Sequence, residues 1–143
     1  MLMGEYHHNI DDKGRLVIPT NFRKDIGETF VIAKGLEKCL YIYPLEMWEQ
    51  FREKLSKLPT SDPKARAFVR HFYANAVECE IDKQGRMVIP QELRQYAGIE
   101  KEMVTVGLID KIEIWSKSEW DKEEGGPQMD PEDFAQAMME YGI

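Results

Sequence analysis

An aspartate followed four residues later by an arginine, with a glycine directly before the arginine, occurs twice in the 143-residue chain. The two copies consist of Asp11, Gly14 and Arg15, and of Asp82, Gly85 and Arg86. An aspartate favours a turn and a glycine accepts a positive φ, so the arginine is expected at the tip of a short β-turn. Its planar guanidinium offers five donors in a fixed fork, which suits the guanine edge or a backbone phosphate of DNA.

Two roles are open for this pattern. Each aspartate could pair with its arginine as a structural ion pair, or it could fix the loop and orient a guanidinium that binds DNA. The duplication favours the second role, because a protein with pseudo-two-fold symmetry matches the two-fold symmetry of a duplex. Lys13 and Lys83 lie near the arginines but at different positions of the two copies. Each lysine could therefore contact a DNA phosphate, or its side chain could simply be exposed to water. The predicted DNA-binding residues are Arg15, Arg86, Lys13 and Lys83, and the predicted loop-orienting residues are Asp11, Gly14, Asp82 and Gly85.

The two motifs belong to a longer internal repeat. The segment IDDKGRLVIP at residues 10–19 returns 71 positions later as IDKQGRMVIP, and the similarity continues to Trp48 and Trp120. Each copy predicts two short strands, a helix that starts at a proline and stops at a glycine, and two more strands, with Gly35 or Gly107 near the last turn. A repeat of roughly 45 residues buries too little surface alone, so the two are expected to share one core.

Further helices are predicted outside the repeats. Residues 45–58 carry an apolar helical face, and Asp62 with Pro63 can begin a second helix before the second repeat. A tail helix is predicted after Asp130, and its short apolar face is expected to dock on something. The predicted organisation is a first repeat at 1–51, an inter-repeat helical segment at 52–76, a second repeat at 77–121, and an acidic linker with a tail helix at 122–143.

The charge is unfavourable for nonspecific nucleic-acid binding, because the formal net charge is −7. It is unevenly distributed, however. Residues 116–143 contain two Lys or Arg residues against eight Asp or Glu residues, whereas residues 45–77 contain six against four. A local basic face therefore remains open on residues 1–115, and the basic face with Lys64, Arg66 and Arg70 could bind DNA, contact a neighbouring subunit or be solvated.

Several function classes lack support in the sequence. We find no Gly-rich phosphate loop, no nucleophile motif and no metal-ligand spacing, so no enzyme activity, cofactor, metal site or small-molecule substrate is expected. His7 and His8 are neighbours on a predicted strand and point to opposite faces. Cys39 and Cys79 are 40 positions apart and are expected to be packing residues. No apolar run of membrane-spanning or signal-peptide length occurs, so we expect no membrane partner and a cytoplasmic protein.

The segments GEYHHNIDDKGRLVIP, DKQGRMVIP and KARAFVRHFYANAVECEIDKQGR resemble the MraZ family, transcriptional regulators of bacterial division and cell-wall gene clusters. The resemblance covers residues 1–121 and fades from Glu123 onward. It implies a mixed α+β fold in which two tandem ββαββ AbrB-like swapped-hairpin repeats form one pseudo-two-fold, β-barrel-like core, with two inter-repeat helices and a short C-terminal helix. It also implies assembly into a ring of several subunits.

The expected function is sequence-specific binding of double-stranded promoter DNA. The resemblance implies a nucleoid-associated repressor of its own division and cell-wall operon, which reads repeated promoter boxes with the arginines of its two Asp-x-x-x-Arg loops. The Asp-x-x-x-Arg motif of the family falls on Asp11 to Arg15 and on Asp82 to Arg86. The alternative is an antitoxin-like module that uses its acidic tail to hold a partner protein.

Overall fold

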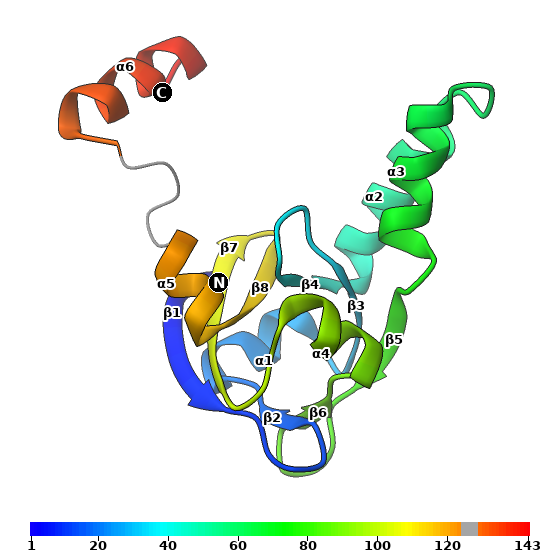
Figure 1. The fold of residues 1–143 in the computed structure, drawn as a ribbon, viewed down its shortest axis with the longest axis vertical. Helices are drawn as coiled ribbons and strands as arrows, with labels where there is room; N and C mark the ends of the chain where they lie inside the picture. Colours follow the sequence, from blue (N-terminus) through cyan, green and yellow to red (C-terminus); the bar gives the residue numbers. More distant parts are fainter. Residues whose placement is uncertain (124–128) are drawn as a thin grey trace.

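The computed structural model describes residues 1–123 and 129–143, which form eight strands and six helices (Figure 1). The strands are β1 (Leu2–Asn9), β2 (Arg15–Val17), β3 (Thr29–Lys34), β4 (Leu40–Pro44), β5 (Val77–Glu80), β6 (Arg86–Val88), β7 (Glu102–Ile109) and β8 (Lys111–Ser116). The helices are α1 (Thr20–Ile26), α2 (Leu45–Ser56), α3 (Pro63–Tyr73), α4 (Gln91–Ala97), α5 (Lys117–Glu123) and α6 (Pro131–Tyr141). This order confirms the mixed α+β fold with two ββαββ repeats, while α5 was not predicted.

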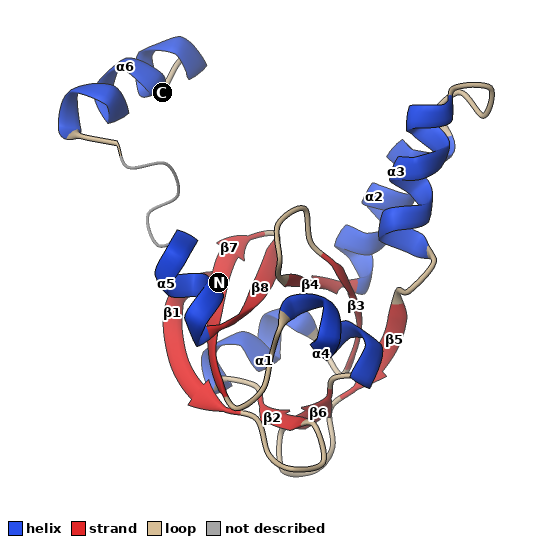
Figure 2. Cartoon of the chain, in the orientation of Figure 1, coloured by secondary structure: helices blue, strands red, loops and turns tan. Residues whose placement is uncertain are grey.

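The strands form one curved six-stranded sheet and one small ribbon. The sheet has the order β1-β7-β8-β4-β3-β5, and β2 pairs with β6 in the two-stranded ribbon. Figure 2 shows α1 and α4 inside the curve of the sheet, above this ribbon. Within the described residues the sheet does not close into a barrel, because β2 and β6 leave its two edges and pair with each other instead. The barrel-like core that we expected is therefore an open sheet completed by two helices and a ribbon.

Strand pairing exchanges elements between the repeats. The first strand of each repeat pairs antiparallel with the third strand of the other, as β1 with β7 and β5 with β3. The second strands pair with each other, and so do the fourth strands β4 and β8. Two further hydrogen bonds repeat the exchange, since Ile18 N donates to Gly85 O at 2.9 Å and Ile89 N donates to Gly14 O at 2.8 Å. The two repeats therefore share a pseudo-two-fold axis and one core.

Both faces of the sheet are buried at its central strands, whereas the edge strands β1 and β5 are largely exposed. Along β3, Phe30 and Ile32 face the first core cluster, whereas Val31 and Ala33 face the second. The first cluster lies beneath α1, α4 and the ribbon, and the second is covered by α2 and α3, with Trp120 of α5 packed against it. Because strands buried on both faces need apolar side chains at consecutive positions, the central strands are nearly continuous hydrophobic runs.

Local chemistry sets the helix boundaries. Asp62 accepts a hydrogen bond from Lys64 N at 2.9 Å and caps α3, which begins at Pro63 as predicted. Gly98 ends α4 in the left-handed region at φ 67°. Pro19 and Pro90 lie at the N-cap of α1 and α4 and not in the first turn, because their extended ψ angles of 134° and 144° precede the helix.

Gly107 lies two residues before the β7–β8 turn, near it as predicted, but within the strand β7 itself. It lies inside β7 opposite Gly4 of β1, where an added Cβ would stand 2.5 Å from Met3 N. The close approach of the two strands therefore requires this glycine. Gly35 lies directly after β3, where its N–H donates to Cys39 O at 2.8 Å, as a turn residue does.

Candidate nucleic-acid interface

The first Asp-x-x-Gly-Arg loop is held together by its aspartate. Asp11 Oδ1 accepts hydrogen bonds from Lys13 N at 2.9 Å and Arg15 N at 2.8 Å, and Asp11 Oδ2 accepts from Arg15 Nε at 2.7 Å. The turn closes through Gly14 N, which donates to Asp11 O at 3.0 Å, and Gly14 has a φ of 76°. One carboxylate thus fixes both the backbone of the loop and the direction of the arginine.

The second loop repeats this geometry. Asp82 Oδ1 accepts from Gln84 N at 2.8 Å and Arg86 N at 2.9 Å, and Asp82 Oδ2 accepts from Arg86 Nε at 2.9 Å. Gly85 has a φ of 75°. The equivalent bonds in both loops show that the geometry follows from the shared sequence pattern.

These bonds stabilise the ionised aspartates. The pKa of Asp11 is lowered from its ordinary value of 3.8, chiefly by the backbone N–H of Arg15 and further by the guanidinium of that residue. The pKa of Asp82 is lowered in the same way by Arg86. Because Nε of each arginine is engaged by its aspartate, the two terminal nitrogens of the guanidinium stay available to an external acceptor.

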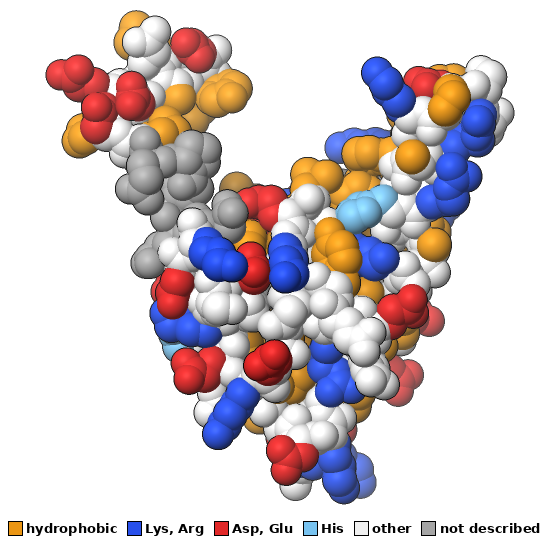
Figure 3. Space-filling view, in the orientation of Figure 1, with side chains coloured by type: hydrophobic (Ala, Val, Ile, Leu, Met, Phe, Trp, Pro, Cys, Tyr) orange, Lys and Arg blue, Asp and Glu red, His pale blue; other side chains and the backbone are white. Residues whose placement is uncertain are grey.

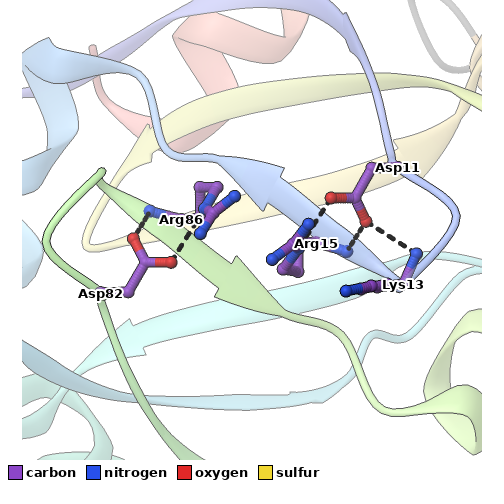
Figure 4. Close-up of polar contacts among 5 residues, drawn as sticks. All are labelled: Asp11, Lys13, Arg15, Asp82 and Arg86. Carbon is purple, nitrogen blue, oxygen red and sulfur yellow. Dashed lines mark hydrogen bonds and ion pairs between the residues drawn. The ribbon is translucent and has the colours of Figure 1, made fainter.

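The ribbon places both arginines on one exposed face. In the β2–β6 register Arg15 lies opposite Val88 and Val17 lies opposite Arg86. Leu16 and Met87 alternate with them and point into the first core cluster. Figure 4 shows both guanidinium groups over the ribbon, between the two aspartates.

Two valines complete this face. Val17 is 49% exposed and Val88 is 53% exposed, beside arginine side chains that are each 29% exposed. The outward face of the ribbon therefore alternates a guanidinium with a branched apolar side chain. We call these four residues, Arg15, Val17, Arg86 and Val88, the ribbon face.

Two further arginines support the loops, and sequence reasoning did not assign them this role. An added Cβ at Gly85 would lie 2.2 Å from Cζ of Arg23, and one at Gly14 would lie 2.8 Å from Cζ of Arg94. Each helix arginine therefore packs against the loop glycine of the other repeat. Arg23 Nε also donates to Ile18 O at 2.9 Å, whereas the buried Arg94 Nε has no hydrogen-bond partner within the described chain. Their recurrence at the fifth position from the proline was the available signal.

The lysines that we predicted beside the arginines differ from each other. Lys13 donates its backbone N–H to Asp11, and its side chain is exposed at the tip of the first loop. Lys83 lines a depression of about 560 Å³ beside the second loop, together with Arg23 and Lys24. Figure 3 shows Lys and Arg side chains at this end of the molecule, with acidic side chains close by.

No cluster of three or more His, Cys, Asp or Glu side chains is placed to hold a metal ion in residues 1–123 and 129–143. Cys39 and Cys79 are free, buried thiols in the two core clusters, as packing residues should be. Within the same ranges, every helix is too short or too polar to cross a membrane.

Comparison with known proteins identifies the family. A family model described as "MraZ protein, putative antitoxin-like" matches residues 1–71 and again residues 72–138. This chain belongs to the MraZ family. The second match ends within α6, so the resemblance to MraZ proteins extends beyond the residue 121 that we expected.

Individual MraZ relatives cover the whole chain. The proteins named transcriptional regulator MraZ from Caldicellulosiruptor bescii and Clostridium tetani are each 50% identical over 143 residues, which is all of this chain and all of theirs. The one from Moorella thermoacetica is 48% identical over the same length. The chain is therefore a member of a family of transcriptional regulators, and the two Asp-x-x-Gly-Arg loops lie in the two matched halves.

Proposed function

We propose that the ribbon face enters the major groove of double-stranded DNA and that Arg15 and Arg86 read guanine edges there. The supporting observation is the position of the two guanidinium groups on one exposed face of a two-stranded ribbon, with their terminal nitrogens free of the aspartates. A major groove admits a two-stranded β-ribbon, and bidentate contact of arginine with guanine is its commonest specific contact.

The valines and lysines of this end take complementary roles. Val17 and Val88 stand beside the arginines and present apolar surface, which suits the methyl group of thymine. Lys13 and Lys83 lie at the loops outside the ribbon face, where they contact phosphate. Asp11, Gly14, Asp82 and Gly85 orient the loops, and the Arg23 and Arg94 side chains support them from below.

A single ribbon makes few contacts, so self-association supplies the affinity. Several ribbons on a homo-oligomeric ring bind repeated promoter boxes together, and each contact after the first becomes intramolecular. This multivalency also lets a protein with a net charge of −7 bind DNA, because only the ribbon end of each subunit approaches the phosphates. The resulting function is a nucleoid-associated repressor of its own division and cell-wall operon, with the boxes in that promoter as its sites.

The test is a binding titration with the full chain and a promoter fragment that carries repeated boxes. Replacing Arg15 and Arg86 by Ala removes both guanidinium groups of each subunit. Each lost base contact costs about 1–3 kcal/mol, so the affinity for the specific DNA should fall at least tenfold for every subunit that is bound. The matched control is Arg52→Ala with Lys54→Ala on α2, which also removes two positive charges from exposed residues. Equal affinity of the double variant and the control would remove the proposal.

The salt dependence separates the arginine role from the lysine role. Replacing Lys13 by Ala should reduce the slope of log affinity against log salt by about one and weaken all sequences alike. Replacing Arg15 by Lys keeps the charge but removes the bidentate fork, so it should reduce discrimination between box and scrambled DNA more than it changes the salt slope.

A further inference from the structure

The tail helix α6 is fully formed but buries no side chain. Asp130 caps its N-terminus by accepting a hydrogen bond from Asp133 N at 2.9 Å, and Gly142 ends it in the left-handed region. Phe134, Met138 and Tyr141 lie at helical spacing on one face and are 48–81% exposed. An isolated helix of 11 residues is only marginally stable in water, so this apolar face needs a partner.

An apolar groove lies between α2 and α3, the two helices of the arm that projects from the body (Figure 1). It has a volume of about 370 Å³, and both helices and the turn that joins them contribute to it. Arg66 and Arg70 stand on its rim, one helical turn apart on α3. The apolar side chains that line the groove are Leu55, Leu58, Pro59, Ala65 and Val69.

The charges of the helix and the groove are complementary. The α6 helix carries Glu132, Asp133 and Glu140 and has no Lys or Arg. The segment 45–77 carries six Lys or Arg residues against four Asp or Glu residues. Figure 3 shows red side chains on α6 and blue side chains along the arm, each beside orange apolar surface.

We propose that α6 of one chain docks into the α2–α3 groove of a second copy of this chain. Phe134, Met138 and Tyr141 fill the apolar floor. Asp133 and Glu140, which lie at the border of this apolar face, pair with Arg66 and Arg70. The proposal rests on the self-association that is part of the proposed function, and it assigns one contact of that assembly.

The geometry favours a neighbouring chain over the same chain. Seven residues, 124–130, connect α5 to α6, and a chain of this length spans at most about 25 Å when fully extended. Figure 1 shows α5 and the arm on opposite sides of the body. The groove residues lie at the outer end of α2, a helix of 12 residues that is about 18 Å long. The length of this helix therefore separates the groove from α5, in addition to the width of the body.

Cross-linking between two variants that each carry one added cysteine tests the contact directly. Ser56→Cys places a thiol on the exposed α2 wall of the groove, and Met138→Cys places one on the apolar face of α6. The native Cys39 and Cys79 are buried and remain unreactive. When the two full-length variants are mixed and treated with a short bis-maleimide, we expect a covalent dimer that contains one chain of each kind.

A second exposed apolar surface provides the control. Met3 lies on the edge strand β1 and is exposed, so Met3→Cys mixed with Met138→Cys should give no cross-linked dimer. A dimer with Met3→Cys in place of Ser56→Cys would overturn the proposal. So would a cross-link that forms only within one chain carrying both Ser56→Cys and Met138→Cys.

Charge reversal gives an independent readout by light scattering. Arg66→Glu with Arg70→Glu places like charges together and should weaken self-association at least about tenfold, and Asp133→Lys with Glu140→Lys should do the same. Mixing the two variants restores opposite charges at every contact between unlike chains and should restore assembly. Unchanged assembly of either variant would contradict the proposal.

Removal of the tail separates this proposal from the proposed function. A chain ending at Glu123 keeps both core clusters intact, because all their members lie before residue 121. It should assemble more weakly than the full chain but still bind a single box through Arg15 and Arg86. Undiminished assembly without the tail would overturn the docking proposal alone, whereas a full chain that is monomeric at every concentration would overturn self-association and docking together.

Discussion

At the scale of single residues, the loops are defined by a carboxylate with three hydrogen-bonding partners. Asp11 accepts two backbone N–H groups and one guanidinium N–H, and Asp82 repeats this arrangement. The aspartate thus fixes the loop backbone and holds its arginine in one direction, and binding of DNA by that guanidinium is our proposal. A carboxylate that contacts DNA phosphate would be repelled, whereas one that holds Nε of an arginine directs the rest of the fork outward.

Replacing Asp11 by Asn tests this orienting role. The amide cannot accept from both the backbone and Arg15 Nε in the way a carboxylate does, so the guanidinium loses its fixed direction, and DNA affinity should fall by about tenfold. The matched control is Asp12→Asn, which removes the same charge from the neighbouring exposed residue. If repulsion of phosphate were the dominant effect, both changes would raise affinity in the same titration.

The loop aspartates should also titrate at a lower pH than an ordinary aspartate. Their pKa values are lowered in the folded protein, so their stabilising contribution is present above pH 3.8 and is lost as the pH falls through the lowered values. NMR titration of the carboxyl carbons should place both midpoints below 3.8. Arg15→Gln should move the midpoint of Asp11 upward and leave that of Asp82 unchanged, and a common shift of both would contradict the local cause.

At the scale of secondary-structure elements, most helix and strand boundaries follow from local residue preferences. The β7–β8 turn is an exception. The β7–β8 hairpin turns through Ile109 and Asp110, since Leu108 pairs with Lys111. Ile109 has a φ of 67° and is 92% exposed, and Asp110 N donates to Leu108 O at 2.8 Å. A β-branched residue at positive φ in such a γ-turn is strained, and no burial compensates for the strain.

Ile109→Gly should therefore stabilise the protein. Relief of the left-handed strain contributes about 1–2 kcal/mol, and the added flexibility of the unfolded chain removes about 0.5–1 kcal/mol of it. The free energy of unfolding, measured by urea denaturation, should rise by roughly 0.5–1 kcal/mol. The control is Leu36→Gly, an exposed loop residue without a positive φ, which should lower the stability. A decrease for Ile109→Gly as well would show that the turn is not strained.

At the scale of the whole molecule, the decisive feature is the exchange of strands between the two repeats. No repeat can form its share of the sheet alone, because β1 and β3 have β7 and β5 as partners from the other half. The exchange also brings Arg15 of the first repeat beside Arg86 of the second on one ribbon. The ribbon face therefore exists only when both repeats are folded together.

Division of the chain in the turn between α2 and α3 tests this dependence. Fragments 1–61 and 62–143 should each lack cooperative thermal unfolding when separate, because their strand partners are missing. Mixed in equal amounts, they should regain the circular dichroism and the cooperative transition of the intact protein. A fragment that unfolds cooperatively as a monomer, with its mass established by light scattering, would show that a single repeat is an independent domain.

The sequence by itself determined the features that depend on neighbours along the chain. The duplicated Asp-x-x-Gly-Arg pattern specified both turns and the aspartate–arginine pairs, because their bonds join residues at most four positions apart. The cap at Asp62 and the stop at Gly98 likewise follow from local hydrogen bonding and allowed φ angles.

Only the tertiary structure decided which distant segments meet. The order of the six strands, the open sheet in place of a barrel, and the packing of Arg23 and Arg94 against glycines of the opposite repeat depend on contacts far apart in sequence. The alternation of apolar and polar residues along a strand indicates which side chains share a face. It leaves the partner strand undetermined, because any strand of suitable pattern can form the backbone hydrogen bonds of the ladder. The arrangement of Arg15 and Arg86 on a common ribbon was therefore settled by the packing of the two repeats around one core.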